Sequence, residues 1–211
     1  SYELNPLSSD PLILISRIKN FEAAESLSVG DETGAKKLNE SAIDYLKEVE
    51  KINPDYSEIY LNFGIIYYDL KDYTKSIKNY IKAIELGQAD SFPMVYHDLA
   101  ESQKKIKKYY DAIYNYKKSI DLLESQVEIA HLNNDIGLVK AIMGDYKMAI
   151  QDFEIAVELH SEIPEYIYNL GISLIKSEIN LEKGEDLIKK AKKLAKNSNS
   201  VLGENIDLVK W

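Results

Sequence analysis

The chain has 211 residues, of which 45% are hydrophobic and 29% are charged, a composition typical of a folded protein with one large domain or two small ones. Its formal net charge is −9 and Arg17 is its only arginine, which argues against duplex nucleic acid as a partner because neutralising phosphates needs clustered basic residues. The absence of cysteine excludes disulfides, zinc–thiolate sites and cysteine nucleophiles.

The first predicted element is a helical hairpin over residues 10–55. In its first helix, residues 10–27, Asp10 is the expected N-cap and Pro11 takes the first helical position. The second helix is predicted over residues 41–55, where Pro54 ends it, and "SVGDETG" (28–34) is expected to form a loop between the two. The apolar run "PLILI" (11–15) is too short for a signal-peptide core or for a bilayer span.

Downstream, one spacing of small and aromatic residues recurs four times. Gly64 is followed by Ser76 after twelve residues, by Tyr80 after sixteen and by Ala83 after nineteen. The same order recurs at Ala100, Ala112, Tyr116 and Ser119, at Gly137, Ala149, Phe153 and Ala156, and, one residue late, at Gly171, Gly184, Ile188 and Ala191. The copies are offset by 36, 37 and 34 residues, and short turns are expected at residues 71–73, 107–109 and 144–146.

Three of the four leading small residues are glycines: Gly64, Gly137 and Gly171. Inside a helix, glycine costs about 1 kcal/mol relative to alanine. We therefore expect these glycines to lie where two helix backbones approach closely, with the aromatic residue of each copy filling the remaining space.

The order Gly, Ala, Phe or Tyr, Ala on a period close to 34 residues resembles the tetratricopeptide repeat. The resemblance implies an all-α, right-handed superhelical solenoid of about five helix-turn-helix repeats with a terminal capping helix, in a single domain over residues 1–211. The expected units are a divergent first repeat (10–55), three well-matched repeats (57–90, 93–126 and 130–163), a repeat with a one-residue insertion (164–197), and a capping helix or tail (198–211). The alternatives are a first-repeat register anchored on Gly30, and a chain that continues past Trp211 into further repeats.

In this family the ligand usually lies along the first helices, in a concave groove. Carried over position by position, the resemblance implies a groove wall of apolar residues with charged residues between them. Its predicted partner-binding residues are Glu58, Leu61, Ile65, Tyr68, Met94, His97, Glu101, Lys104, Lys105, His131, Asn134, Leu138, Ile142, Tyr168, Ile172, Ile175 and Lys176. Such a wall suits an amphipathic helix or an extended peptide with apolar anchors, and the chain's own N-terminal helix or Trp211 tail is the competing occupant.

One subtype of the family grips a C-terminal carboxylate with lysine and asparagine side chains. Here Leu61 and Ile65 stand where lysine and asparagine are needed, and Asp135 occupies one of the basic positions. Carboxylate recognition of that kind is therefore not expected.

No motif for catalysis or phosphate binding is present: the sequence lacks GxSxG, HExxH and a glycine-rich phosphate loop. His97 and His131 fall on neighbouring first helices, where Asp98, Glu101 and Asn134 could complete a divalent metal site. Two histidines specify little, and we interpret them as ordinary polar residues of the groove. The sequence thus predicts no catalytic, cofactor-binding or metal site, and no enzyme.

The sixteen tyrosines suggest a second hypothesis, in which their side chains form a surface for stacking bases or sugars. Tyr60, Tyr80, Tyr96 and Tyr116 fall at repeat positions that pack between helices, so we expect them in the core. Outside those positions, Tyr110 and Tyr114 are the candidates for an exposed contact surface.

The predicted function is a non-catalytic scaffold or adaptor that binds a protein or peptide segment with apolar anchors. We expect no nucleic acid partner and no membrane span. The alternatives are a self-assembling, homo-oligomeric module, and a regulatory or targeting segment of a larger enzyme or cell-envelope complex. A cytoplasmic location is favoured weakly, and a processed exported protein fits the sequence as well.

Overall fold

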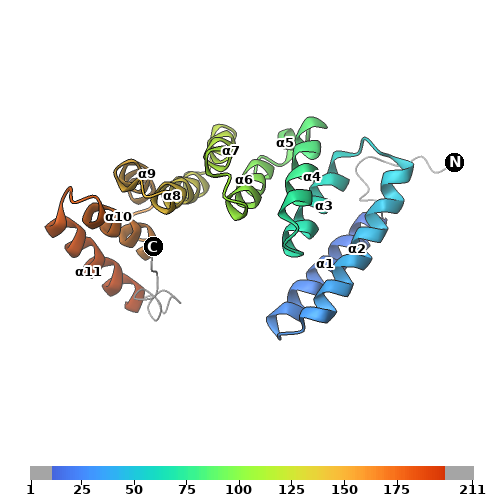
Figure 1. Ribbon diagram of the computed structural model, residues 1–211, viewed down its shortest axis with the longest axis horizontal. Helices are drawn as coiled ribbons and strands as arrows, with labels where there is room; N and C mark the ends of the chain where they lie inside the picture. The colour runs from blue at the N-terminus through green and yellow to red at the C-terminus, as the bar shows by residue number, and fades with distance from the viewer. Residues whose placement is uncertain (1–10, 198–211) are drawn as a thin grey trace. The chain divides into compact units, whose positions relative to one another are not determined.

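The structure is a computed structural model that describes residues 11–197. Within that range every regular element is an α-helix (Figure 1), so the predicted all-α repeat fold is confirmed. The helices are α1 (Pro11–Ser28), α2 (Glu32–Ile52), α3 (Ser57–Asp69), α4 (Tyr73–Glu85), α5 (Gln88–Ser91), α6 (Val95–Lys105), α7 (Tyr109–Asp121), α8 (Gln126–Ile142), α9 (Tyr146–Leu159), α10 (Pro164–Lys176) and α11 (Leu181–Asn197).

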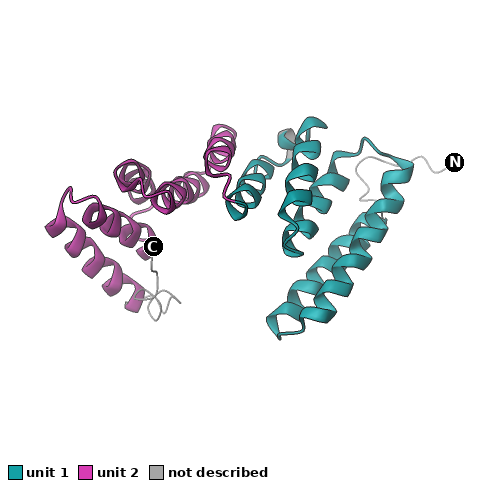
Figure 2. Cartoon of the chain, viewed as in Figure 1, with its two compact units in different colours: residues 1–106 teal, residues 107–211 magenta. Residues whose placement is uncertain are grey.

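The chain divides into two compact units, Ser1–Ile106 and Lys107–Trp211 (Figure 2). The division falls in the turn between α6 and α7, inside the segment expected to be one repeat (93–126). In unit 1 the closest helix pairs are α1 with α2 and α3 with α4, and in unit 2 they are α8 with α9 and α10 with α11. Sequential antiparallel hairpins are thus the building blocks of both units.

The first hairpin corrects one expectation. Helix α2 begins at Glu32, nine residues before the predicted start, so only residues 29–31 connect it to α1 and the predicted loop over 28–34 is wrong. The cause is local: the side chain of Asp31 accepts a hydrogen bond from the backbone N–H of Gly34 at 2.8 Å and caps the helix. The expected N-cap Asp10 and the expected capping helix at 198–211 lie outside the described residues.

The turns inside the later hairpins each contain one residue with positive φ. Lys71, Lys107, Gly144 and Glu178 each adopt a left-handed conformation, with φ of 61°, 62°, 84° and 59°, which is the usual way to end an α-helix. The next helix then begins with a side-chain cap in three of four turns: Asp72, Asp145 and Asn180 accept from backbone N–H groups. The turn between α10 and α11 has four residues where the others have three, which matches the late spacing of the fourth copy.

The small residues of the repeat lie at helix crossings, as predicted. A Cβ atom added to Gly64 would stand 2.5 Å from the ring of Tyr80, and one added to Gly137 would stand 2.6 Å from the ring of Phe153. Where the small residue is Ser76, its hydroxyl donates to the carbonyl oxygen of Gly64 at 2.8 Å. These contacts leave no room for a methyl group, so close approach explains the glycines.

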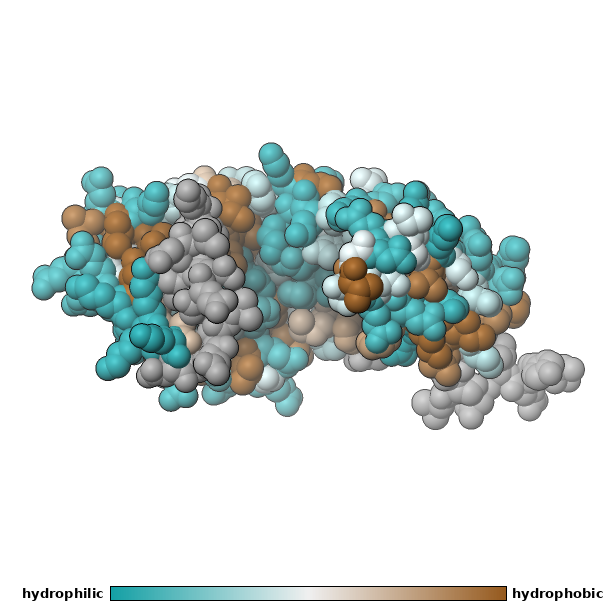
Figure 3. Space-filling view, turned by 90° about the horizontal axis from the view of Figure 1, so that it is seen from below, coloured by the Kyte–Doolittle hydropathy of each residue, from teal (hydrophilic) through white to brown (hydrophobic). Residues whose placement is uncertain are grey.

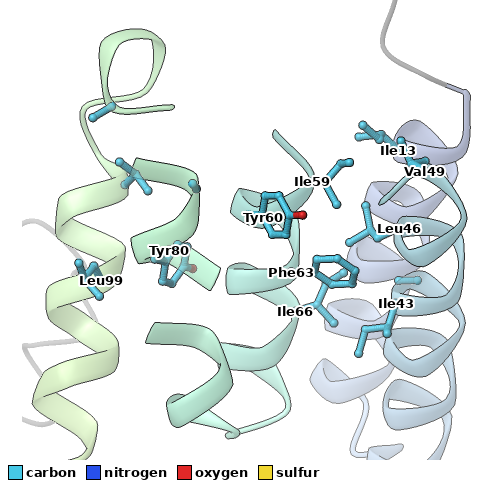
Figure 4. Close-up of a cluster of buried hydrophobic side chains, with 14 residues drawn as sticks. Ile13, Ile43, Leu46, Val49, Ile59, Tyr60, Phe63, Ile66, Tyr80 and Leu99 are labelled. Atoms are coloured by element: carbon cyan, nitrogen blue, oxygen red, sulfur yellow. The ribbon is translucent and has the colours of Figure 1, made fainter. Parts of the chain in front are cut away.

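The core of unit 1 is built around α3. Phe63 and Ile66 of α3 point toward Ile43 and Leu46 of α2 (Figure 4), and all four side chains are buried. The core prediction for the tyrosines is confirmed for three of them, because Tyr60, Tyr80 and Tyr116 are buried, while Tyr96 is partly buried. Tyr110 and Tyr114 are exposed, as expected.

Candidate partner-binding surfaces on the first helices

The residues predicted to bind a partner lie on α3 and α6 in unit 1 and on α8 and α10 in unit 2, apart from Met94, which immediately precedes α6. Helices α3, α8 and α10 each pack one side against the second helix of their hairpin, and α6 packs against α4. The side chains that remain accessible on these helices are therefore the candidates for contact with a partner.

On α3, Leu61 and Ile65 are only partly buried and rest against the unit 1 core. Tyr68, one turn further on, packs edge-on against Tyr73 with ring centroids 5.4 Å apart. Burial and the nearby carboxylate of Glu101 raise the pKa of Tyr68 to about 12, so its hydroxyl stays protonated at neutral pH and can donate a hydrogen bond. Glu58 begins the row, accepting from the Tyr56 hydroxyl at 2.7 Å.

On α6 the predicted residues are polar and paired within their own helix. The Nδ1 atom of His97 lies 3.1 Å from Oδ1 of Asp98, and Lys104 donates to Glu101 one turn before it. Lys105 is exposed at the end of the helix. This helix therefore offers charge rather than apolar surface, with the positive charge at its C-terminal end, where the helix dipole favours it.

In unit 2 the predicted contact residues include an exposed apolar side chain. On α8, Leu138 is partly buried and Ile142, four residues later on the same face, is 50% exposed. On α10, Ile172 and Ile175 are partly buried, and Lys176 follows them exposed. An exposed isoleucine beside a partly buried leucine on a helix that is otherwise largely buried is a candidate anchor site.

Two of the predicted residues are not accessible. Tyr168 is buried with Ile167, Ala191 and Ala195 at the packing between α10 and α11. Asn134 is 1% exposed, and its side-chain oxygen accepts a hydrogen bond from the Asn169 amide at 2.8 Å. These two side chains hold the helices of unit 2 together, so we remove them from the proposed contact surface.

The structure also reveals polar residues that the prediction of site residues omitted. Asp135 is buried on α8, where Oδ2 lies 3.6 Å from Nε2 of His131. Nδ1 of the same imidazole lies 3.4 Å from the hydroxyl of Tyr166 on α10. The sequence does contain a signal for this network, because the same repeat position holds a polar residue in all four copies: Asn62, Asp98, Asp135 and Asn169.

The carboxyl group of Glu165, in the first turn of α10, has a pKa above its ordinary value. Burial is the larger cause, and the negative charge of Asp135 adds to it, while His131 acts in the opposite direction. The folded protein therefore binds this proton more readily than the unfolded chain does. Folding stability contributed by this group rises as the pH falls through the folded-state pKa, and at neutral pH the partly buried charge is unfavourable.

Replacing Glu165 with glutamine is therefore expected to stabilise unit 2 near pH 7 and to lose that advantage near pH 4, where the wild-type carboxyl is neutral in the folded protein. Urea unfolding of both proteins at the two pH values measures the effect. Glu162→Gln, at an exposed position just before the same helix, is the matched control and should change little at either pH. A stabilisation by Glu165→Gln that grows toward acid pH would have the wrong sign for this account.

No helix within residues 11–197 is long and apolar enough to cross a membrane.

The comparisons with known proteins agree with the repeat fold. A family model of the tetratricopeptide repeat matches residues 57–89, which span α3 and α4. No curated protein sequence matches the chain.

Solved structures resemble the chain over most of its length. BtubC from P. vanneervenii has a TM-score of 0.71 and 19% identity, covering 90% of this chain and 84% of that one. MamA (41–end) from Desulfovibrio magneticus RS-1 has a TM-score of 0.68 and 19% identity, covering 88% and 97%. YrrB, described as a TPR protein with an unusual peptide-binding site, has a TM-score of 0.64 and 18% identity, covering 83% and 84%. At these identities the likeness establishes the fold.

Proposed function

We propose that this chain, a tetratricopeptide repeat protein by the repeat at residues 57–89 and by its fold, is a non-catalytic scaffold that binds a partner protein through its first helices. The partner segment carries apolar side chains that dock on the accessible isoleucine and leucine residues. YrrB, whose fold the chain shares, is described as having a peptide-binding site, which supports this class of function.

The observation that carries the proposal is the exposure of Ile142 on α8. Nine residues of this helix are buried, yet Ile142 is half exposed with Leu138 one turn before it on the same face. Covering such a pair with a partner's apolar side chain removes it from water, at about 25 cal/mol per Å² of apolar surface. A helix or an extended peptide with apolar residues one turn or two positions apart can present side chains at this spacing.

Charged residues beside the apolar ones supply orientation. Lys104 and Lys105 lie at the end of α6, and Lys176 lies at the end of α10, while Glu58 and Glu101 carry negative charge on α3 and α6. Exposed charges at the rim of an interface act mainly on association rate and register. We therefore assign specificity to these residues and affinity to the apolar ones.

Affinity capture from native lysate tests the proposal with Ile142→Glu as the variant. A carboxylate at this position puts charge where an apolar side chain must dock, and the half-exposed site tolerates it without unfolding the protein. We expect at least one protein captured by the wild type to lose about tenfold or more of its binding. Circular dichroism confirms that the variant remains folded.

The matched control is Ile155→Glu, because Ile155 is 41% exposed but lies on α9, the second helix of the same hairpin. This control should retain every captured protein. If Ile142→Glu captures the same proteins as the wild type while Ile155→Glu loses one, the partner binds the second helices and the proposal is wrong.

A further inference from the structure

Helix α1 carries an exposed apolar face that no described element covers. Its buried side, which includes Ile13, Ser16 and Ala23, packs chiefly on α2. On the opposite side, Leu14, Ile18 and Phe21 are 47%, 48% and 65% exposed, and their spacing of four and three residues places them in one row. The space-filling view shows hydrophobic residues reaching the surface among polar ones (Figure 3).

The exposed face of α11, the last described helix, is polar instead. The exposed side chains of α11 are almost all lysine or acidic residues, among them Glu185, Lys189 and Lys193. The exposed face of α11 is therefore polar, whereas α1 presents large apolar side chains whose burial is favourable.

The residues around Phe21 are arranged for pairing with a copy of themselves. When two helices pack antiparallel about Phe21, residue n of one lies level with residue 42 − n of the other. Arg17 of each copy then faces Glu25 of the other copy. This gives two such pairs, related by a two-fold axis. The same register sets Ile18 opposite Ala24, a large side chain against a small one.

The charges on α1 are available for this role. In the described part of the chain, the Glu25 carboxylate has no hydrogen bond or ion pair, and its residue is exposed. Among residues 11–197, the Arg17 guanidinium pairs with Glu58 at 3.8 Å, and its side chain is 59% exposed. A guanidinium has five N–H donors, so further donors remain for another carboxylate.

We propose that α1 is a homodimerisation surface, on which the α1 helix of a second copy of this chain packs antiparallel about Phe21. The partner is thus a second copy, held by the apolar row and by two Arg17–Glu25 pairs. A helix of 18 residues is about 27 Å long, and one helix pair is a small interface, so the dimer is reversible and forms at higher protein concentration.

Sedimentation velocity of the full chain between about 1 μM and about 1 mM tests the association. The wild type should shift from monomer to dimer with concentration, and Phe21→Glu or Ile18→Glu should weaken dimerisation by about tenfold or more. Ile155→Glu, an exposed isoleucine in unit 2, should leave it unchanged. A chain that stays monomeric throughout, or a dimer that Phe21→Glu leaves intact, overturns the proposal.

Charge reversal tests the register. Arg17→Glu and Glu25→Arg should each weaken the dimer, because each sets two like charges level with one another, and the double variant should restore it. A double variant no better than the single ones contradicts the antiparallel pairing about Phe21.

The absence of cysteine allows a direct test of direction. In the antiparallel dimer, two thiols introduced by Phe21→Cys meet at the symmetry axis and should form a disulfide under mild oxidation. Two thiols introduced by Ser28→Cys are separated by 14 residues along the helix axis, about 21 Å, and should not. Cross-linking of Ser28→Cys as fast as Phe21→Cys would indicate a parallel pair or random encounter, and either result overturns the proposed geometry.

Discussion

Gly171→Ala is expected to destabilise unit 2 by about 3 kcal/mol, at the upper end of overpacking effects. A Cβ atom at this position would stand 2.9 Å from the carbonyl oxygen of Gly184 and 2.9 Å from Cγ1 of Ile188, both on α11. The approach is reciprocal, because a Cβ atom at Gly184 would lie 2.8 Å from the carbonyl oxygen of Gly171. A backbone oxygen has no alternative rotamer, so the two helices must move apart.

Urea unfolding followed by circular dichroism measures this loss, and hydrogen exchange locates it. We expect the amides of α11 to exchange faster first, since separation from α10 removes the packing that buries Ala191 and Ala195. Lys190→Ala, at an exposed position on α11, is the control and should change stability by no more than about 0.5 kcal/mol. A Gly171→Ala protein as stable as the wild type would show that the two backbones are not this close.

Gly137→Ala is expected to destabilise unit 2 by about 2 kcal/mol, and a second substitution should recover part of the loss. Here the three atoms nearest to the added Cβ atom all belong to the ring of Phe153, at 2.6 Å for Cε1, 2.8 Å for Cδ1 and 2.9 Å for Cζ. Leucine lacks the outer ring atoms, so Phe153→Leu makes room for the methyl group. The double variant should therefore be more stable than the sum of the single effects predicts, by about 1 kcal/mol or more.

The sign of the single substitution separates two explanations of the glycine. Helix propensity alone predicts that Gly137→Ala stabilises the protein by about 1 kcal/mol, whereas the contact with Phe153 predicts a loss. Combining Gly137→Ala with Ile150→Val, which alters a core residue other than Phe153 on the same helix, is the control and should be additive. A stabilising Gly137→Ala would contradict the packing explanation of the repeat.

The helix crossings could be predicted from the sequence because they depend on residues within one hairpin at fixed spacing. Gly64 with Tyr80 and Gly137 with Phe153 are separated by the same sixteen residues, and the same turn geometry brings each pair into contact. The same spacing recurs in each copy of the repeat, so a contact expected in one hairpin is expected in the next.

The start of α2 could not be placed in the same way. The expected loop was inferred from a run containing Gly30 and Gly34, residues that commonly break helices. Of these two glycines, Gly30 has positive φ, whereas Gly34 lies within the first turn of α2 and its N–H donates to the side chain of Asp31. The capping residue Asp31 therefore indicated the start of α2 more reliably than Gly34 indicated a loop.

The accessibility of the candidate residues could be predicted only in part, because it depends on neighbouring hairpins. Tyr168 and Asn134 were predicted to contact a partner, yet Tyr168 packs on α11 and Asn134 binds Asn169 of α10. Neither contact follows from spacing within a single repeat. The exposure of the apolar row on α1 could not be predicted for a related reason. A helix rich in isoleucine and leucine is expected to be buried unless its neighbours are known.

The most direct test of the proposed partner surface is photo-crosslinking from a single introduced thiol, which the absence of cysteine makes specific. Ile142→Cys and Ile155→Cys proteins are each labelled with a benzophenone maleimide and irradiated in native lysate. Partner binding on the first helices predicts a discrete adduct from position 142 and none from position 155, although the two side chains are similarly exposed. A discrete adduct from position 155 with none from position 142 would contradict the proposal and place the partner on the second helices.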